Sequence, residues 1–346
     1  MIIQKNLREL KKILSEVSLK AKKTRKKSAI VITTTAKKSV DDLIILPVRE
    51  TIDVICGAVT IYNIRTAVRI VKEIDGKVDY IIIDAEQKVN GLENLLKLVS
   101  CHISKSKILT FKSNDITVDS TDAIIAKLLC NNFDKKIAII GAGNIGSKLA
   151  LKLVERGVNV FVARRKIENA SKLANALNFI KFKHSIARVI PKSLSTIAKN
   201  ADMLIGFTAG IPVINSKMIS QMKKGGIIID GGVGTIYKDA ILAAQKKKIK
   251  ILRVDIRSGF AATIRLLLET EELLGKTFGR NKLRGIHVVA GGFYGRYGEI
   301  ILDRITRPTK IIGIADGNGG VLRGRLSPDL KYKIKIIENL IKRNRR

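Results

Sequence analysis

Tryptophan is absent from the sequence, and cysteine occurs only three times, at positions 56, 101 and 130. No two cysteines form a Cys-x-x-Cys pair, which argues against a disulfide framework or a zinc knuckle. The three histidines are equally scattered, so we expect no metal site. We expect each cysteine to be a small buried residue.

Long apolar runs are also missing. No stretch reaches the ~18 uninterrupted apolar residues of a membrane span, and the charged amino terminus lacks the apolar core of a secretory signal. A hydrophobic fraction of 46% still suffices for buried cores. We therefore expect a cytoplasmic protein of about two domains with no membrane partner.

Acidic residues are scarce: 30 Asp and Glu stand against 65 Lys and Arg, a net charge of +35. Such a charge is typical of nucleic-acid binding, because cations neutralise phosphates. The charge is spread along the whole chain, however, and aromatic residues for base stacking make up only 4%. We therefore disfavour nucleic acid as a partner. The positive electrostatic field of such a chain also favours anionic substrates or cofactors.

Residues 1–27 predict a basic amphipathic helix. Its apolar positions repeat in steps of four and three and form one stripe; they are Ile3, Leu7, Leu10, Leu14, Val17 and Ala21. This stripe packs either on its own domain or on a partner subunit, and the second arrangement implies a homo-oligomer.

Strands alternating with helices predict an α/β protein of two domains. Residues 28–119 are expected to form the smaller substrate domain, with strands at 29–33, 80–84 and 108–111 and helices at 62–74 and 92–100. A bridging helix is predicted at 120–132, beginning at Ser120 with Thr121 and Asp122 in its first turn.

Residues 133–260 predict a Rossmann domain with a parallel sheet, built from strands at 137–140, 159–163, 203–206, 226–230 and 249–255. Residues 261–346 then hold a helix at 261–274 that returns towards the first domain, and a Gly-rich, strand-like segment with a turn at 316–320.

The strongest motif follows the strand at 137–140 and opens a helix. It is a Gly-x-Gly-x-x-Gly sequence in the context that dinucleotide binding requires, and it reads Gly141, Ala142, Gly143, Asn144, Ile145 and Gly146. Gly141 permits a tight turn, Gly143 lets the backbone approach a pyrophosphate, and Gly146 lets the helix pack closely on the strand.

The residues after the second Rossmann strand favour NADP. An acidic side chain near this point takes the ribose hydroxyls in NAD-specific domains. Here Ala163 is followed by Arg164, Arg165 and Lys166. No carboxylate repels a 2′-phosphate, and two guanidinium groups are available to hold one.

Two further strand ends are expected at the same edge of the sheet. Thr208, Ala209 and Gly210 follow the strand at 203–206 and are predicted to border the nicotinamide. Asp230 and Gly231 end the next strand. Small residues at this edge allow a flat ring to lie against the backbone.

With these motifs, residues 108–235 resemble the amino-acid-dehydrogenase-like Rossmann superfamily. It includes shikimate and quinate dehydrogenases, glutamyl-tRNA reductases, and methylene-tetrahydrofolate or methylene-tetrahydromethanopterin dehydrogenases. Residues 163–177, residues 204–214 and the Asp119-Ser120-Thr121 sequence are most similar to the NADP-dependent methylene-tetrahydromethanopterin dehydrogenases. The resemblance implies hydride transfer in an interdomain cleft to a pterin-like carrier of one-carbon metabolism. Positioning two flat rings can suffice for such a transfer.

Two alternatives remain open. Ser120-Thr121-Asp122 resembles the Asn-Thr-Asp sequence of shikimate dehydrogenases, which would imply a small acid as substrate, but Arg65 stands near the position of their catalytic lysine and is a poor acid–base group. The other alternative is a non-catalytic nucleotide-sensing or nucleic-acid-binding Rossmann protein. Asp122 is the first candidate for a catalytic carboxylate and Asp84 the second.

Two residues of the Gly-rich segment, Tyr294 and Arg296, are candidate substrate contacts, but the segment favours a simple hairpin turn at this point.

Overall fold

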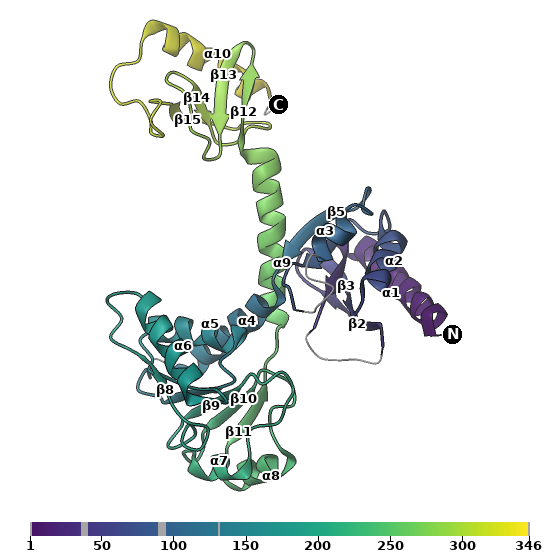
Figure 1. Cartoon of the computed structure of the whole chain (residues 1–346). Helices are drawn as coiled ribbons and strands as arrows, with labels where there is room; N and C mark the ends of the chain where they lie inside the picture. The colour runs from purple at the N-terminus through teal and green to yellow at the C-terminus, as the bar shows by residue number, and fades with distance from the viewer. Residues whose placement is uncertain (1, 36–40, 89–94, 131, 345–346) are drawn as a thin grey trace. The chain divides into compact units, whose positions relative to one another are not determined.

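The computed structural model describes residues 2–35, 41–88, 95–130 and 132–344, with side chains described from residue 7 to residue 343. The chain forms two compact units, Met1–Ile264 and Arg265–Arg346. The first unit holds two sheets and the second holds a third (Figure 1). The predicted α/β class is confirmed.

The first sheet has the strand order β2-β3-β1-β4-β5. Its strands are β1 Lys27–Thr33, β2 Leu43–Glu50, β3 Val54–Ile61, β4 Tyr80–Asp84 and β5 Lys107–Phe111. All neighbours are parallel except β2, which pairs antiparallel with β3. Strands β2 and β3 were not predicted from the sequence. β2 is a half-exposed edge strand in which Pro47 follows the four apolar residues 43–46, and a proline within such a run weakens the strand pattern.

The helices of this domain are α1 Ile2–Thr24, α2 Ile64–Ile74 and α3 Leu95–Ser100. The apolar stripe of α1 is buried in the core of its own domain, through Leu10, Leu14, Val17 and Ala21. The structure therefore places this helix on its own domain. The side chain of Ile3 lies outside the described side chains. The predicted start of the third helix, residue 92, lies outside the described residues.

The bridging helix, α4 Ser113–Leu129, begins seven residues before the predicted Ser120. Its first residue is fixed by Asp84, which accepts a hydrogen bond from Ser113 Oγ at 2.8 Å. Thr121 and Asp122 consequently lie buried in the middle of the helix. The prediction was wrong because a threonine can also bond within a helix: Thr121 Oγ1 donates to the Thr117 carbonyl at 2.6 Å.

The second sheet is entirely parallel, with the order β11-β10-β9-β6-β7-β8. Its strands are β6 Ile137–Ile140, β7 Val160–Ala163, β8 Val189–Pro191, β9 Met203–Gly206, β10 Ile227–Asp230 and β11 Lys250–Arg253. The five predicted strands are all present, and only the three-residue β8 was missed. The strand order reverses between β6 and β9, where open α/β sheets bind ligands.

Helices cover both faces of this sheet: α5 Asn144–Glu155, α6 Ile167–Ile180, α7 Ser216–Gln221 and α8 Lys238–Lys246. The helix predicted at 261–274 is α9 Arg257–Glu272, continued by a π-helical turn at Leu273–Thr277. Its start returns to the first domain as expected, because the ring of Phe260 lies 5.7 Å from the Arg49 guanidinium.

The second unit contains β12 Gly279–Leu283, β13 Ile286–Ala290, β14 Ile300–Leu302, β15 Ile311–Ile314 and α10 Pro328–Asn344. The turn predicted at 316–320 is confirmed: Asp316 accepts hydrogen bonds from the Asn318 and Gly320 amides. The hairpin expected around Tyr294 is wrong, because β13 and β14 run parallel.

Cys56 is buried, and burial raises the pKa of its thiol to about 12. Cys101 and Cys130 are exposed, contrary to expectation. Within the described residues, every helix is too short or too polar to span a bilayer.

Candidate functional site

The Gly-rich turn after β6 has the geometry of a dinucleotide cradle. Gly141 has φ +82°, and a Cβ there would lie 2.5 Å from the Phe207 carbonyl oxygen. A Cβ on Gly146 would lie 2.9 Å from the Gly141 oxygen, so only glycine allows α5 to begin this close to the strand. Both positions match the sequence prediction.

Gly143 differs from these two glycines, because a Cβ there would meet nothing nearer than 4.0 Å. The backbone is therefore open to an approaching group. The N-cap of α5 is Gly143, which has no side chain to bond the first turn, whereas the Asn63 side chain caps α2. A helix start without a capping side chain at its N-cap is suited to a phosphate, so these residues fit the pyrophosphate of an NAD(P) cofactor.

The three cations after β7 are exposed. In the described part of the chain, the side chains of Arg164, Arg165 and Lys166 form no ion pair or hydrogen bond. Ala163, the last residue of β7, is fully buried and leaves no acidic group at the strand end. These features fit a ligand with an additional phosphate.

The loops after β9 and β10 are packed tightly on each other. A Cβ on Gly231 would lie 2.1 Å from the Phe207 ring, and one on Gly232 would lie 3.0 Å from the Thr208 amide. Ala209 and Gly210 have φ of +50° and +81°. The predicted residues thus share one edge of the sheet.

Asp230 is committed to its own loop. It accepts hydrogen bonds from Thr235 Oγ1 at 2.9 Å and from the Gly234 amide at 2.8 Å. Its carboxylate therefore shapes the loop that follows β10, and Thr208 likewise closes its loop by donating to the Ile211 carbonyl.

Helices α4 and α5 run parallel and in register. Three ion pairs connect them in ascending order: Asp115–Lys148, Asp119–Lys152 and Asp122–Arg156. Both helices therefore begin at the same end, and Asn114 Nδ2 donates to Asn144 Oδ1 over 3.3 Å. Two helix amino termini, each carrying partial positive charge, consequently lie beside the cofactor turn.

Asp115 stands between Lys112 and Lys148 at this end, with oxygen–nitrogen distances of 2.8 and 2.5 Å. Burial acts to raise the pKa of its carboxyl, but hydrogen bonds from the two ammonium groups outweigh burial, so the pKa is lowered. Asp115 thus stays ionised and fixes the two lysines near the helix starts.

A polar cluster lies at the carboxyl end of β4, and of its members only Asp84 was predicted from the sequence. Lys88 Nζ is 2.7 Å from Asp84 Oδ2 and 3.0 Å from Glu86 Oε2, and it also contacts Ser113 Oγ. Asp84 is fully buried. Glu86 Oε2 accepts a hydrogen bond from the backbone amide of Asn114 at 2.8 Å. The cluster therefore fixes the start of α4 and, through Asn114, reaches Asn144 of the cofactor turn.

Asp122 does not join this cluster. Arg156 Nε and Nη2 donate to its two oxygens at 2.8 and 2.6 Å, and the side-chain hydrogen bond to Asp122 raises the pKa of Arg156. Arg156 follows the last residue of the 12-residue α5, roughly 18 Å along the helix from Gly143. We therefore assign Asp122 to helix packing and place Asp84 first among the candidate carboxylates.

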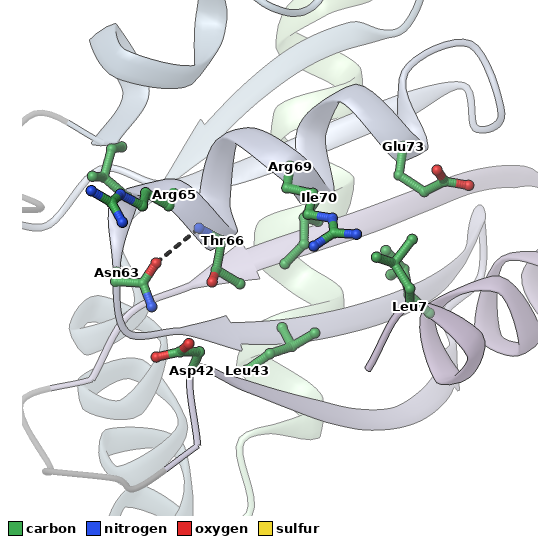
Figure 2. A pocket seen from close by; sticks show the side chains of 11 residues that line it. Leu7, Asp42, Leu43, Asn63, Arg65, Thr66, Arg69, Ile70 and Glu73 are labelled. Atoms are coloured by element: carbon green, nitrogen blue, oxygen red, sulfur yellow. Dashed lines mark hydrogen bonds between the residues drawn. The ribbon is translucent and has the colours of Figure 1, made fainter. Parts of the chain in front are cut away.

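A separate hollow of about 610 Å³ lies between α1, α2 and β2. Figure 2 shows Leu7, Leu43 and Ile70 around it, with Asn63 and Arg65 near one end and Glu73 near the other. Arg65, compared above with a catalytic lysine, thus lines this hollow, which contains none of the cofactor residues. Among the described residues, no group of three or more His, Cys, Asp or Glu is placed to hold a metal ion.

The Gly-rich turn lies within a region that is similar to a known protein family. Residues 136–234 match the family described as NADP oxidoreductase coenzyme F420-dependent. Glutamyl-tRNA reductase of Caldivirga maquilingensis is 26% identical over 167 residues, which are 46% of this chain and 39% of that protein. The chain therefore spans well under half the length of this curated relative.

Two solved structures are also similar to this chain. Shikimate dehydrogenase in complex with NADP⁺ is 13% identical, with a TM-score of 0.40, covering 69% of this chain and 88% of the other. L-Tryptophan dehydrogenase of Nostoc punctiforme is 18% identical, with a TM-score of 0.40, covering 63% of this chain and 62% of the other. The family match spans β6 to β10 and supports an NAD(P)-dependent oxidoreductase.

Proposed function

We propose that this protein is an NADP(H)-dependent dehydrogenase that transfers hydride between the nicotinamide and a substrate held next to α4. The observation that carries this proposal is the open backbone at Gly143, where α5 begins, together with exposed Arg164 and Arg165, whose side chains form no ion pair or hydrogen bond among the described residues. The bound dinucleotide supplies the hydride chemistry, and the chain supplies binding, orientation and charge.

Each part of the site has one task in this proposal. The first turn of α5 holds the pyrophosphate, and Arg164 and Arg165 hold the 2′-phosphate. The loops containing Thr208 and Gly231 form the edge of the sheet that borders the nicotinamide. The cluster of Lys88, Asp84 and Ser113 fixes the opposite wall.

For the substrate, we propose a methylene-tetrahydropterin, either methylene-tetrahydromethanopterin or methylene-tetrahydrofolate. The site contains a well-formed cofactor turn, while the buried pair of Asp84 and Lys88 already has further hydrogen-bond partners. A reaction driven by charge on the substrate itself suits such a site. A cytoplasmic location, expected from the sequence, belongs to the same proposal.

A shikimate- or quinate-type alcohol dehydrogenase is the second candidate, and its proton transfer would have to involve Lys88 and Asp84. The buried, mid-helix position of Thr121 and Asp122 removes the motif on which that resemblance rested.

The test is a titration of the purified protein with NADPH and NADH, followed by nicotinamide fluorescence. Turnover is then assayed with methylene-tetrahydromethanopterin, methylene-tetrahydrofolate, shikimate, quinate and coenzyme F420, the last because the matched family is named for it. We expect tight NADPH binding and turnover of a methylene-tetrahydropterin. Failure to bind either dinucleotide would refute the dehydrogenase itself, whereas binding with turnover of another substrate would refute only the substrate assignment.

A further inference from the structure

The loop that joins β13 to β14 exposes three aromatic side chains. Phe293, Tyr294 and Tyr297 are 51%, 76% and 70% exposed. The whole sequence contains only 9 Phe, 6 Tyr and no Trp, so three exposed rings within five residues are a marked local concentration. Exposed aromatic groups of this kind are typical of binding surfaces.

This aromatic loop is held in place by close packing. A Cβ on Gly295 would lie 2.4 Å from the Ala315 side chain and 3.0 Å from that of Val289. The ring of Tyr294 lies over Gly319, where a Cβ would be 3.1 Å from ring atoms. The rings are therefore presented by a folded loop.

An ion pair fixes the same loop from the side. Arg280 Nη2 donates to the Tyr294 carbonyl at 3.0 Å, and its Nε is 3.2 Å from the buried Glu299 carboxylate. Glu299 also accepts a hydrogen bond from the backbone amide of Arg296 at 2.8 Å. Rings held in advance lose little conformational freedom when a ligand stacks on them.

Cationic residues lie on the sheet face that the aromatic loop covers. Arg280 and Lys282 lie opposite Val289 and His287 in the β12–β13 register, and so share one face of the sheet with them. The aromatic loop covers Val289 on this face. The other face packs on α10 through Val288 and its neighbours.

Most of this charge is not neutralised. Lys282 and Arg296 are exposed, and their side chains form no ion pair in the part of the chain that the structure describes. Across residues 265–346, the sequence has 18 Lys and Arg against 8 Asp and Glu. The surface therefore combines flat rings with a positive field.

We propose that this face of the C-terminal unit binds single-stranded nucleic acid. Bases stack on Phe293, Tyr294 and Tyr297, and backbone phosphates lie against Lys282 and Arg296. Stacking on aromatic rings within a cationic surface is how proteins bind single strands. A duplex keeps its bases paired and offers this surface only its phosphates. This proposal revises the expectation from the sequence, where the scarcity of aromatics over the whole chain concealed their local concentration.

The experiment uses the full-length protein and fluorescein-labelled oligouridine or oligothymidine of about 20 nucleotides, with a duplex of the same length, measured by fluorescence anisotropy at about 50 and 200 mM salt. We expect both single strands to bind, more weakly at the higher salt. Tyr294→Ala and Tyr297→Ala should each weaken binding by about fivefold or more. Tyr332→Ala, which removes a 65% exposed tyrosine from α10, should leave it unchanged.

Phe293→Leu and Tyr294→Leu keep an apolar side chain but remove the flat ring, so they separate lost stacking from a disrupted loop; thermal unfolding verifies that each variant folds. Absence of binding at the lower salt overturns the proposal. The proposal is also overturned if Tyr332→Ala weakens oligonucleotide binding as much as the loop variants do. The same holds if the duplex binds as tightly as the single strands and its affinity is unchanged in Tyr294→Ala and Tyr297→Ala, because net charge alone would then explain the binding.

Discussion

The side-chain amide of Asn114 donates a hydrogen bond to the side-chain oxygen of Asn144 over 3.3 Å, and so joins the first turn of α4 to the first turn of α5. Because the two helices are parallel and in register, their positive ends lie together at the proposed pyrophosphate site. This relationship makes residue 144 a sensitive position for added charge.

Asn144→Asp places a carboxylate of nearly the same shape at that position. We expect the affinity for NADPH and for NADH to fall together by about tenfold or more, because the new charge repels the pyrophosphate. The stability of the fold should be retained or slightly raised, since an acidic residue suits a helix amino terminus. Nicotinamide fluorescence titration and thermal unfolding measure the two effects.

The matched control for this change is Asn215→Asp, which makes the same substitution at the cap of α7. Dinucleotide affinity should not change there, because Asn and Asp are comparable caps. An unchanged affinity in the Asn144 variant would remove α5 from the cofactor site.

Replacing Arg164 and Arg165 together by Ala tests the cofactor preference. Hydrogen bonds between charged partners contribute about 1.5–3 kcal/mol each, so the affinity for NADPH should fall by roughly tenfold or more, while that for NADH changes little. Lys172→Ala on α6 removes a cation elsewhere in the same domain and serves as the control. Equal losses for both dinucleotides would show that these arginines do not contact a 2′-phosphate.

The sequence was sufficient to predict the Rossmann half of the protein, because its strands are short buried runs and the glycine spacing has one physical explanation. It was insufficient for α4. Ser120, Thr121 and Asp122 are typical helix-start residues, and only the tertiary contact of Ser113 with Asp84 shows that the helix begins earlier. The Lys88 cluster was equally hidden, since its members are separated by up to 29 positions along the chain and meet only when β4 lies beside α4.

Gly259 is predicted to be required for the packing of α9 on α4. A Cβ there would lie 2.3 Å from Ser120 Oγ and 2.9 Å from the Ile116 carbonyl oxygen. The carbonyl belongs to the helix backbone and cannot move aside easily. We expect Gly259→Ala to lower the free energy of unfolding by about 1–3 kcal/mol, the usual result of overpacking.

Chemical denaturation of the full-length protein measures this effect, and Gly275→Ala is the control. A Cβ on Gly275 meets nothing within 4 Å, so this substitution should be neutral or slightly stabilising, because alanine is the better helix former. Equal stability of the two variants would contradict a close contact between α9 and α4.

Lys88→Met tests the polar cluster at the end of β4. The methionine leaves Asp84, whose side chain is fully buried, without its cationic partner, and breaking such a pair costs about 3–5 kcal/mol. We expect a clear loss of thermal stability and of turnover. Lys112→Met, which breaks a largely exposed pair with Asp115, should change stability by at most about 1 kcal/mol.

The double variant Lys88→Met with Asp84→Asn separates positioning from chemistry. It removes the Lys88 charge and the buried Asp84 charge together and leaves Glu86 ionised beside the Asn114 backbone amide, so part of the stability should return. Turnover that returns with stability would mean that the cluster only positions α4 and Asn114 beside the cofactor turn. Turnover that stays low in a stable protein with normal NADPH affinity would mean that Lys88 or Asp84 acts on the substrate, and would favour the alcohol dehydrogenase over the methylene-tetrahydropterin dehydrogenase.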